Sequence, residues 1–247
     1  MDFRDILKFR VLSALILIIK LLTNNTFAQS INNNDIIYND INEKITNLNS
    51  YDFIHYPLIN GKKYNKYYYG IKGHQFFDSQ NFCEGEIIIK DKKYTDLLIR
   101  YDIYNDIVNL SSNAGNELVN IELNKNIITG FYIDDHLFIK YDFPESSGID
   151  EYNGFYEMVY NGKIKVAFKW VKYICNSQDI YSGEFITERT VYIINNNQFS
   201  KIKNRRDILS LFKDKEHKIK KFLRSNKFIA KKANASEYIE LIKFYEN

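Results

Sequence analysis

Four carboxylates in the chain could take part in acid–base chemistry: Asp102, Asp106, Asp134 and Glu157. General acid–base catalysis needs two such groups that converge on one bond and differ in their environments. Asp102 and Asp106 lie four residues apart, which would bring them together on a helix, but the β-rich residues around them predict a bend between strands. Asp side chains in bends commonly bind backbone amides. The sequence therefore identifies no catalytic residue.

Asp134, Asp135 and His136 form the densest cluster of potential metal ligands. Two carboxylates and an imidazole could hold a divalent ion if another ligand came from elsewhere in the fold. Adjacent residues on a strand point to opposite faces, so these three converge only in a turn, where Asp pairs are also common without a metal. We keep them as metal candidates and expect neither a metal nor a cofactor.

Other signatures of catalysis are missing from the sequence. The four histidines are scattered, and no serine lies in a GxSxG context. The glycine-rich phosphate-binding motifs are also missing. Cys83 and Cys175 do not form a CxxC pair. They could form one disulfide in an oxidising compartment or remain two buried free thiols, and both alternatives stay open.

Aromatic residues are abundant, with 20 Tyr, 18 Phe and one Trp, Trp170. Exported β proteins can bind sugars on aromatic platforms, so a ligand platform is one interpretation. Tyr is also a good strand former, and Tyr, Phe, Ile, Asn and Lys are enriched together, as codon bias in an A/T-rich genome would produce. We expect mainly structural use of the aromatic residues.

Residues 1–28 show the features of a cleavable signal peptide in the correct order. A weakly basic start precedes the apolar run Val11–Leu22, and the small residues Thr26 and Ala28 precede the expected cleavage after Ala28. The apolar run is shorter than the ~20 residues that a membrane-spanning helix needs, and a buried or uncleaved helix is the alternative. We expect an exported protein that is periplasmic, associated with the outer membrane or secreted, without a transmembrane segment after cleavage.

Charge is distributed unevenly along the chain. Residues 29–200 hold sixteen Lys/Arg and twenty-three Asp/Glu, a net charge of −7, whereas residues 201–247 hold fourteen and six, a net charge of +8. The basic C-terminal part could meet anionic lipid headgroups or an acidic partner. Alternatively, it forms the solvated face of helices whose charge complements the acidic body. Export argues against nucleic acid as the partner.

Short apolar and aromatic segments alternate with turn signals after residue 50, which predicts an antiparallel β domain over residues 51–203. Residues 29–50 are polar and predict a mobile mature N-terminus. Asn161-Gly162 between two β-rich runs predicts a hairpin with a type I′ turn. The segments expected to form strands are Tyr67–Ile71, Gly85–Lys90, Tyr94–Tyr101, Ile107–Leu110, Leu118–Leu123, Ile127–Ile133, Leu137–Phe143, Phe155–Tyr160, Ile164–Ile174, Thr190–Ile194 and Phe199–Ile202.

The hydrophobic period changes to that of helices after Asn204. Asn204 opens one predicted helix, a second begins near Asp214, and Asn234 with Glu237 resembles the capping box of a third. We expect residues 204–247 to form a basic helical tail packed on the β domain. The predicted fold is mainly β (α+β), an antiparallel half-barrel or sandwich with C-terminal amphipathic helices.

The stretch Gly73–Val108 resembles the centre of an uncharacterised family of exported proteins from the Bacteroidota, and the likeness runs from about Tyr56 to the C-terminus. That resemblance implies a bacterial cell envelope and no particular activity. It is carried by Gly73 with Phe76-Phe77, Gly85, Tyr94, Tyr101–Asp106, Gly154–Glu157, Asn161-Gly162-Lys163 and Arg205–Leu209.

These observations favour a non-enzymatic cell-envelope protein that binds a ligand or partner in the apolar cradle of a curved sheet. The partner would be an envelope protein, a lipid or a glycan. One alternative is an exported hydrolase whose clustered carboxylates converge in a cleft. Another is a structural partner of an outer-membrane complex, which would expose a sizeable apolar patch.

Overall fold

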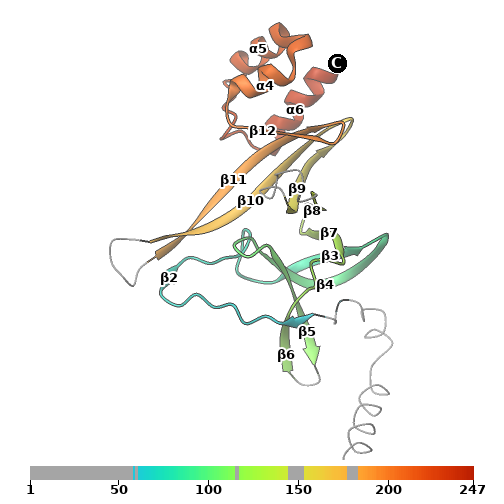
Figure 1. The fold of residues 1–247 in the computed structure, drawn as a ribbon, viewed down its shortest axis with the longest axis vertical. Coiled ribbons are helices and arrows are strands. Elements are labelled where there is room, and N and C mark those ends of the chain that lie inside the picture. The colour runs from blue at the N-terminus through green and yellow to red at the C-terminus, as the bar shows by residue number, and fades with distance from the viewer. Residues whose placement is uncertain (1–57, 59–60, 115–116, 144–152, 177–182) are drawn as a thin grey trace, which may run out of the picture. The chain divides into compact units, whose positions relative to one another are not determined.

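The structure is a computed structural model that describes residue 58 and residues 61–114, 117–143, 153–176 and 183–247 (Figure 1). The predicted signal peptide and mature N-terminus lie outside the described residues. The described strands form one open sheet in the order β1-β6-β5-β4-β3-β7-β8-β9-β10-β11-β12, antiparallel except where β2 pairs with β11. The predicted mainly β, antiparallel class is confirmed, as a single sheet and not a two-sheet sandwich.

The strands are β1 (Lys62–Lys63), β2 (Ile71–Lys72), β3 (Cys83–Ile89), β4 (Lys92–Asp102), β5 (Ile107–Ala114), β6 (Glu117–Glu122), β7 (Ile128–Ile133), β8 (His136–Tyr141), β9 (Gly154–Asn161), β10 (Ile164–Asn176), β11 (Gly183–Asn195) and β12 (Gln198–Ile202). The helices are α4 (Arg205–Leu211), the 3₁₀ turn η3 (Lys213–Lys215), α5 (Glu216–Ser225) and α6 (Ala235–Glu246).

Tight turns join neighbouring strands through residues that tolerate a left-handed backbone. Asn196 and Asn197 connect β11 to β12 with φ angles of +48° and +61°, as a type I′ turn requires. The hairpin predicted at Asn161-Gly162 is confirmed, since β9 pairs with β10. The predicted turn type is wrong, because Asn161 pairs with Lys165, so the connection is too long for a two-residue turn, and neither Asn161 nor Gly162 has a positive φ.

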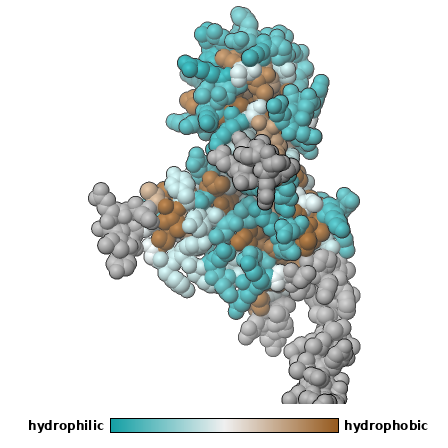
Figure 2. All heavy atoms as spheres, viewed as in Figure 1, coloured by the Kyte–Doolittle hydropathy of each residue, from teal (hydrophilic) through white to brown (hydrophobic). Residues whose placement is uncertain are grey.

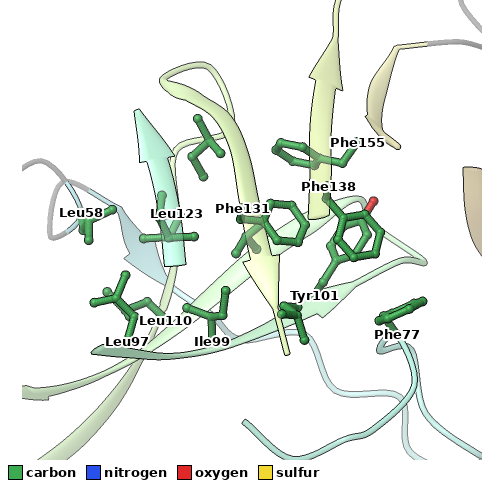
Figure 3. Packing of buried hydrophobic residues seen from close by; sticks show 14 of the residues in the cluster. Leu58, Phe77, Leu97, Ile99, Tyr101, Leu110, Leu123, Phe131, Phe138 and Phe155 are labelled. Atoms are coloured by element: carbon green, nitrogen blue, oxygen red, sulfur yellow. The ribbon is translucent and has the colours of Figure 1, made fainter. Parts of the chain in front are cut away.

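The core of the sheet combines aliphatic side chains with a group of aromatic rings (Figure 3). Phe131 in β7 and Phe138 in β8 occupy paired positions, and their rings stack with centroids 4.8 Å apart. Tyr101 and Phe155 pack edge-on against Phe131 at 5.1 and 5.0 Å. All four side chains are almost completely buried. These buried rings pack against one another and so stabilise the sheet.

The predicted helix starts at Asn204 and Asn234 are confirmed. Each side chain accepts a backbone amide in the first turn of its helix, and an acidic residue three positions later binds back to the cap, Asp207 in α4 and Glu237 in α6. Such a reciprocal capping box satisfies two of the backbone amides that a helix start leaves unpaired.

The helices pack on the sheet through apolar side chains. Ile208, Ile219 and Tyr238 are fully buried in a cluster that also contains Val166 and Phe168 of β10. Among the described residues, no ion pair joins the helices to the strands. The contact between the helices and the strands is therefore mainly apolar, and no ion pair in the described part of the chain supplies the charge complementarity that the sequence offered as one alternative.

Strand β10 remains paired with β9 for only part of its length, and Lys169 occupies the place where the two separate. The ammonium of Lys169 donates a hydrogen bond to the carbonyl oxygen of Phe155 at 3.1 Å and lies 3.6 Å from Oδ2 of Asp106. Asp106 also binds the ammonium of Lys125 and the hydroxyl of Tyr101. A charged lysine thus replaces strand pairing at this point.

This charged cluster is partly sheltered from water, since the side chain of Lys169 is 10% exposed, that of Asp106 23% and that of Lys125 36%. Burial alone would raise the pKa of Asp106, but the ammonium groups of Lys169 and Lys125 outweigh it and hold that pKa below its usual value. Burial lowers the pKa of Lys169, which Asp106 partly opposes. Gly154 is required beside them, since a Cβ there would lie 2.1 Å from Oδ2 of Asp106 and the φ of Gly154 is +122°.

We expect Asp106→Asn to lower the free energy of unfolding at pH 7 by about 3 kcal/mol, because it leaves two ammonium groups near each other without their counter-charge. The native pKa of Asp106 is depressed, so its stabilisation is complete above the unfolded pKa near 4 and is lost as the pH falls through the native pKa. Urea unfolding at pH 7 and pH 3 should show a difference between wild type and variant that shrinks in acid. Asp91→Asn, at an exposed turn, is the matched control. A difference that is equal at both pH values would contradict this account.

Candidate functional site

Asp102, one of the carboxylates considered for acid–base chemistry, is completely buried at the end of β4. Its Oδ2 accepts hydrogen bonds from the hydroxyl of Tyr64 at 2.8 Å and from the side-chain amide of Asn105 at 2.7 Å. Its Oδ1 accepts the backbone amides of Tyr104 and Asn105. The predicted bend with side chain–backbone hydrogen bonding is confirmed. Asp102 is therefore a structural carboxylate that fixes a turn and holds Tyr64.

Tyr64 belongs to a strap, defined as residues 61–82, which runs from β1 at one end of the sheet to β2 beside β11 and then into β3. The backbone amide of Tyr64 donates to the carbonyl oxygen of Asn120 at 2.8 Å. The amide group of Gln75 donates to the hydroxyl of Tyr64 at 2.9 Å and to the carbonyl oxygen of Lys66 at 3.1 Å. The buried side chains of Asp102 and Gln75 thus anchor the strap around Lys66 through these hydrogen bonds.

Two cations anchor the later part of the strap. The ammonium of Lys172 in β10 donates to the carbonyl oxygens of His74 and Phe76 at 2.7 and 2.6 Å. The guanidinium of Arg100 lies 3.9 Å from the ring centroid of Phe76 and 4.3 Å from that of Phe82. Burial lowers the pKa of both Lys172 and Arg100, as expected for cations withdrawn from water. The strap is therefore fixed on either side of its central segment.

That central segment carries three consecutive tyrosines that alternate in direction. Tyr68 packs edge-on against Tyr104 and Phe185, with centroids 5.2 and 5.4 Å apart, and its hydroxyl accepts the side-chain amide of Asn105. Tyr67 and Tyr69 instead face solvent and are 61% and 90% exposed. Their rings lie 6.3 Å apart at an angle of 27°. We refer to Tyr67 and Tyr69 as the tyrosine pair.

The strap is also basic. Residues 61–77 contain four lysines and no Asp or Glu. Lys62 and Lys72 each lie 3.1 Å from a glutamate of a neighbouring strand, but their side chains stay 75% and 79% exposed. Such exposed ion pairs are weak and screened by salt, so these ammonium groups remain accessible to an external anion. Lys66 donates to the side-chain oxygen of Asn105, next to Tyr68.

Both carboxylate oxygens of Glu157, another candidate acid, have hydrogen-bonding partners within the protein. One of its oxygens lies 2.6 Å from Nδ1 of His136, and the other accepts the indole N–H of Trp170 at 2.6 Å. Phe77 packs edge-on against the rings of His136 and Trp170. Among the described residues, Glu157 shares no hydrogen-bonding partner with Asp102 or Asp106. The carboxylates that the hydrolase hypothesis requires to act together are thus engaged separately.

The metal candidates lie at the hairpin between β7 and β8. Asp134 and Asp135 form its exposed two-residue turn, with a φ of +47° at Asp134, and His136 begins β8 with its ring directed to Glu157. The three side chains therefore form no cluster. In the part of the chain that the structure describes, no three His, Cys, Asp or Glu side chains are arranged to hold a metal ion.

Cys83 and Cys175 are both free thiols in the structure, so the disulfide alternative does not describe this fold. Cys83 is half-buried at the start of β3, where its thiol faces the carbonyl oxygen of Asn81 at 3.8 Å. Cys175 is exposed near the end of β10. Burial and the nearby Asp134 raise the pKa of Cys83, which disfavours a reactive thiolate.

The sequence predicts a strand over Tyr67–Ile71 and does not reveal the tyrosine pair. The structure contains only a short strand there, Ile71–Lys72. A usable signal was nevertheless present, since Tyr67–Tyr69 lies among four lysines in a stretch without a carboxylate. What the sequence did not reveal is which of the three rings faces solvent.

Comparison with known protein families finds no family that matches the chain, and comparisons with curated proteins and with solved structures find no match either. Across the described residues, no helix combines the length and apolar character needed to span a bilayer.

We expect Tyr64→Phe to lower the free energy of unfolding by about 1–2 kcal/mol, because it removes one partner from buried Asp102 and one from buried Gln75. Burial raises the pKa of Tyr64, so the hydroxyl stays protonated and donates throughout the neutral range. Urea unfolding would measure the loss. Tyr69→Phe removes the same atom from a side chain that is 90% exposed and should change stability by less than about 0.5 kcal/mol. Equal effects of the two substitutions would show that the buried network does not hold the strap.

Proposed function

We propose that this chain is an exported, non-enzymatic binding protein of the cell envelope that holds an acidic glycan on the tyrosine pair of its strap. The exposure of Tyr67 and Tyr69 is the observation that carries the proposal. Large aromatic rings are normally buried for their apolar area, and two that lie nearly parallel in water form a small apolar surface suited to stacking.

A sugar ring matches this surface chemically. Its C–H groups present an apolar face that can stack on an aromatic ring, while its hydroxyls stay in water. The lysines of the strap add a preference for carboxylate or sulfate groups on the sugar. The ligand would therefore bind on the outside of the sheet, and not in the apolar cradle expected from the sequence.

The anchors of the strap support binding more than catalysis. Tyr68, Asn105 and Asp102 fix the segment that carries the tyrosine pair, so little conformational entropy is lost when a ligand stacks there. An enzyme would need at least two ionisable groups converging on a common point. The candidate carboxylates Asp102, Asp106 and Glu157 each have separate partners, which favours a binding role over the hydrolase alternative.

Affinity electrophoresis through gels that contain polygalacturonate, with neutral dextran in parallel, tests the proposal. We expect polygalacturonate to retard the protein more strongly than dextran, with an effect that weakens as salt is raised. Tyr67→Ala/Tyr69→Ala should weaken the interaction roughly tenfold or more, because two stacking contacts are lost.

Leu118→Ala is the matched control, since Leu118 is a 76% exposed apolar side chain on β6. It should leave the retardation unchanged. The proposal fails if neither polysaccharide retards the protein, or if the double tyrosine variant is retarded like the wild type. Single-stranded oligonucleotides can also stack on aromatic rings among lysines. Preferential binding of oligothymidylate would therefore replace the glycan with nucleic acid.

A further inference from the structure

Helix α5 exposes mostly cationic side chains, with one carboxylate, Glu216, in its first turn. Ile219 and Leu223 bury the opposite side of the helix in the apolar cluster. The exposed side carries what we call the basic face: Lys218, Lys220, Lys221, Arg224 and, just after the helix, Lys227. Figure 2 shows this end of the molecule as largely hydrophilic, with hydrophobic residues among the polar ones. The periodicity that buries one side of α5 thus gathers its cations on the other.

These cations are not neutralised within the described part of the chain. None of the ion pairs between described residues includes a residue of the basic face. Several nearby carboxylates are used elsewhere: Asp207 and Glu237 cap helices, and Asp214 and Glu246 accept tyrosine hydroxyls. The basic face therefore projects a positive field into solvent.

An exposed apolar side chain follows the basic face two residues after Lys227 in the sequence. Ile229 lies between α5 and α6 and is 56% exposed, while its neighbours Phe228 and Ala230 are buried. The segment is held in place, since the carbonyl oxygen of Ile229 accepts the amides of Lys232 and Ala233 at 2.9 and 2.8 Å. Lys227, Lys231 and Lys232 around it are exposed. A fixed aliphatic tip among lysines is thus presented to solvent.

We propose that the basic face and Ile229 dock this protein on the surface of an anionic lipid bilayer. Lysines spread over a helix suit the diffuse charge of lipid headgroups, and an aliphatic tip between lysines can enter the boundary between headgroups and acyl chains. An acidic protein would need shape-matched contacts and would gain little from a single protruding Ile229. The inference rests on residues separate from the tyrosine pair, so it stands or fails independently of the glycan proposal.

Co-sedimentation with vesicles tests the inference. We expect the protein to bind phosphatidylglycerol vesicles and not phosphatidylcholine vesicles at 50 mM salt, with weaker binding at 300 mM salt. Each basic residue near an anionic surface strengthens binding roughly fivefold, so Lys221→Glu/Arg224→Glu should weaken it about 25-fold or more. Ile229→Ser, which keeps every charge, should weaken binding severalfold because the aliphatic contact is lost.

Lys90→Glu/Lys92→Glu makes the same change of charge at exposed positions of the β3–β4 hairpin and should leave vesicle binding nearly unchanged. Circular dichroism would establish that each variant is folded. No binding to phosphatidylglycerol vesicles overturns the inference. Equal losses in the two charge-reversal variants also overturn it, because they would indicate a response to net charge alone. Binding to heparin that Lys221→Glu/Arg224→Glu abolishes, without binding to vesicles, would assign the basic face to an acidic macromolecule instead.

Discussion

The buried carboxylate of Asp102 is the interaction on which the arrangement of the strap depends. A charge withdrawn from water is tolerated only when hydrogen bonds satisfy it, and Asp102 accepts four from three residues. Two of these fix the turn after β4, and the others reach Tyr64 and the side chain of Asn105. Because Asn105 in turn binds Tyr68, one carboxylate links the end of a central strand to two positions on the strap.

Because this link holds Tyr64 and Tyr68 against the protein, it also determines which neighbouring tyrosines are exposed. Tyr64 and Tyr68 face the protein because their hydroxyls form hydrogen bonds there, with Asp102 and with Asn105. Tyr68 therefore points toward the protein. Because side chains alternate in direction along this segment, Tyr67 and Tyr69 point to solvent. The exposed apolar area is therefore enforced by the polar network below it. The same rule acts at the helical tail, where burial of Ile219 and Leu223 leaves the cations of α5 in solvent.

Local signals predicted the local structure well. The capping boxes at Asn204 and Asn234 depend on residues three positions apart, and most strands follow runs of β-forming residues between turn signals. The contacts that define the candidate site are not local. Tyr64 and Asp102 are 38 residues apart, and Lys172 meets His74 across 98 residues. No periodicity encodes such pairings, so Asp102 could be read from sequence as a turn residue but not as the anchor of a strap.

Amide hydrogen exchange of wild type and Asp102→Asn tests most directly whether Asp102 holds the strap. Loss of the charge should speed exchange at Tyr64, Phe77 and Ile103, whose amides bond between the strap and the sheet. Amides in the long β10–β11 hairpin should keep their protection. Unchanged protection at those three amides, or an equal loss of protection throughout the sheet, would contradict the account.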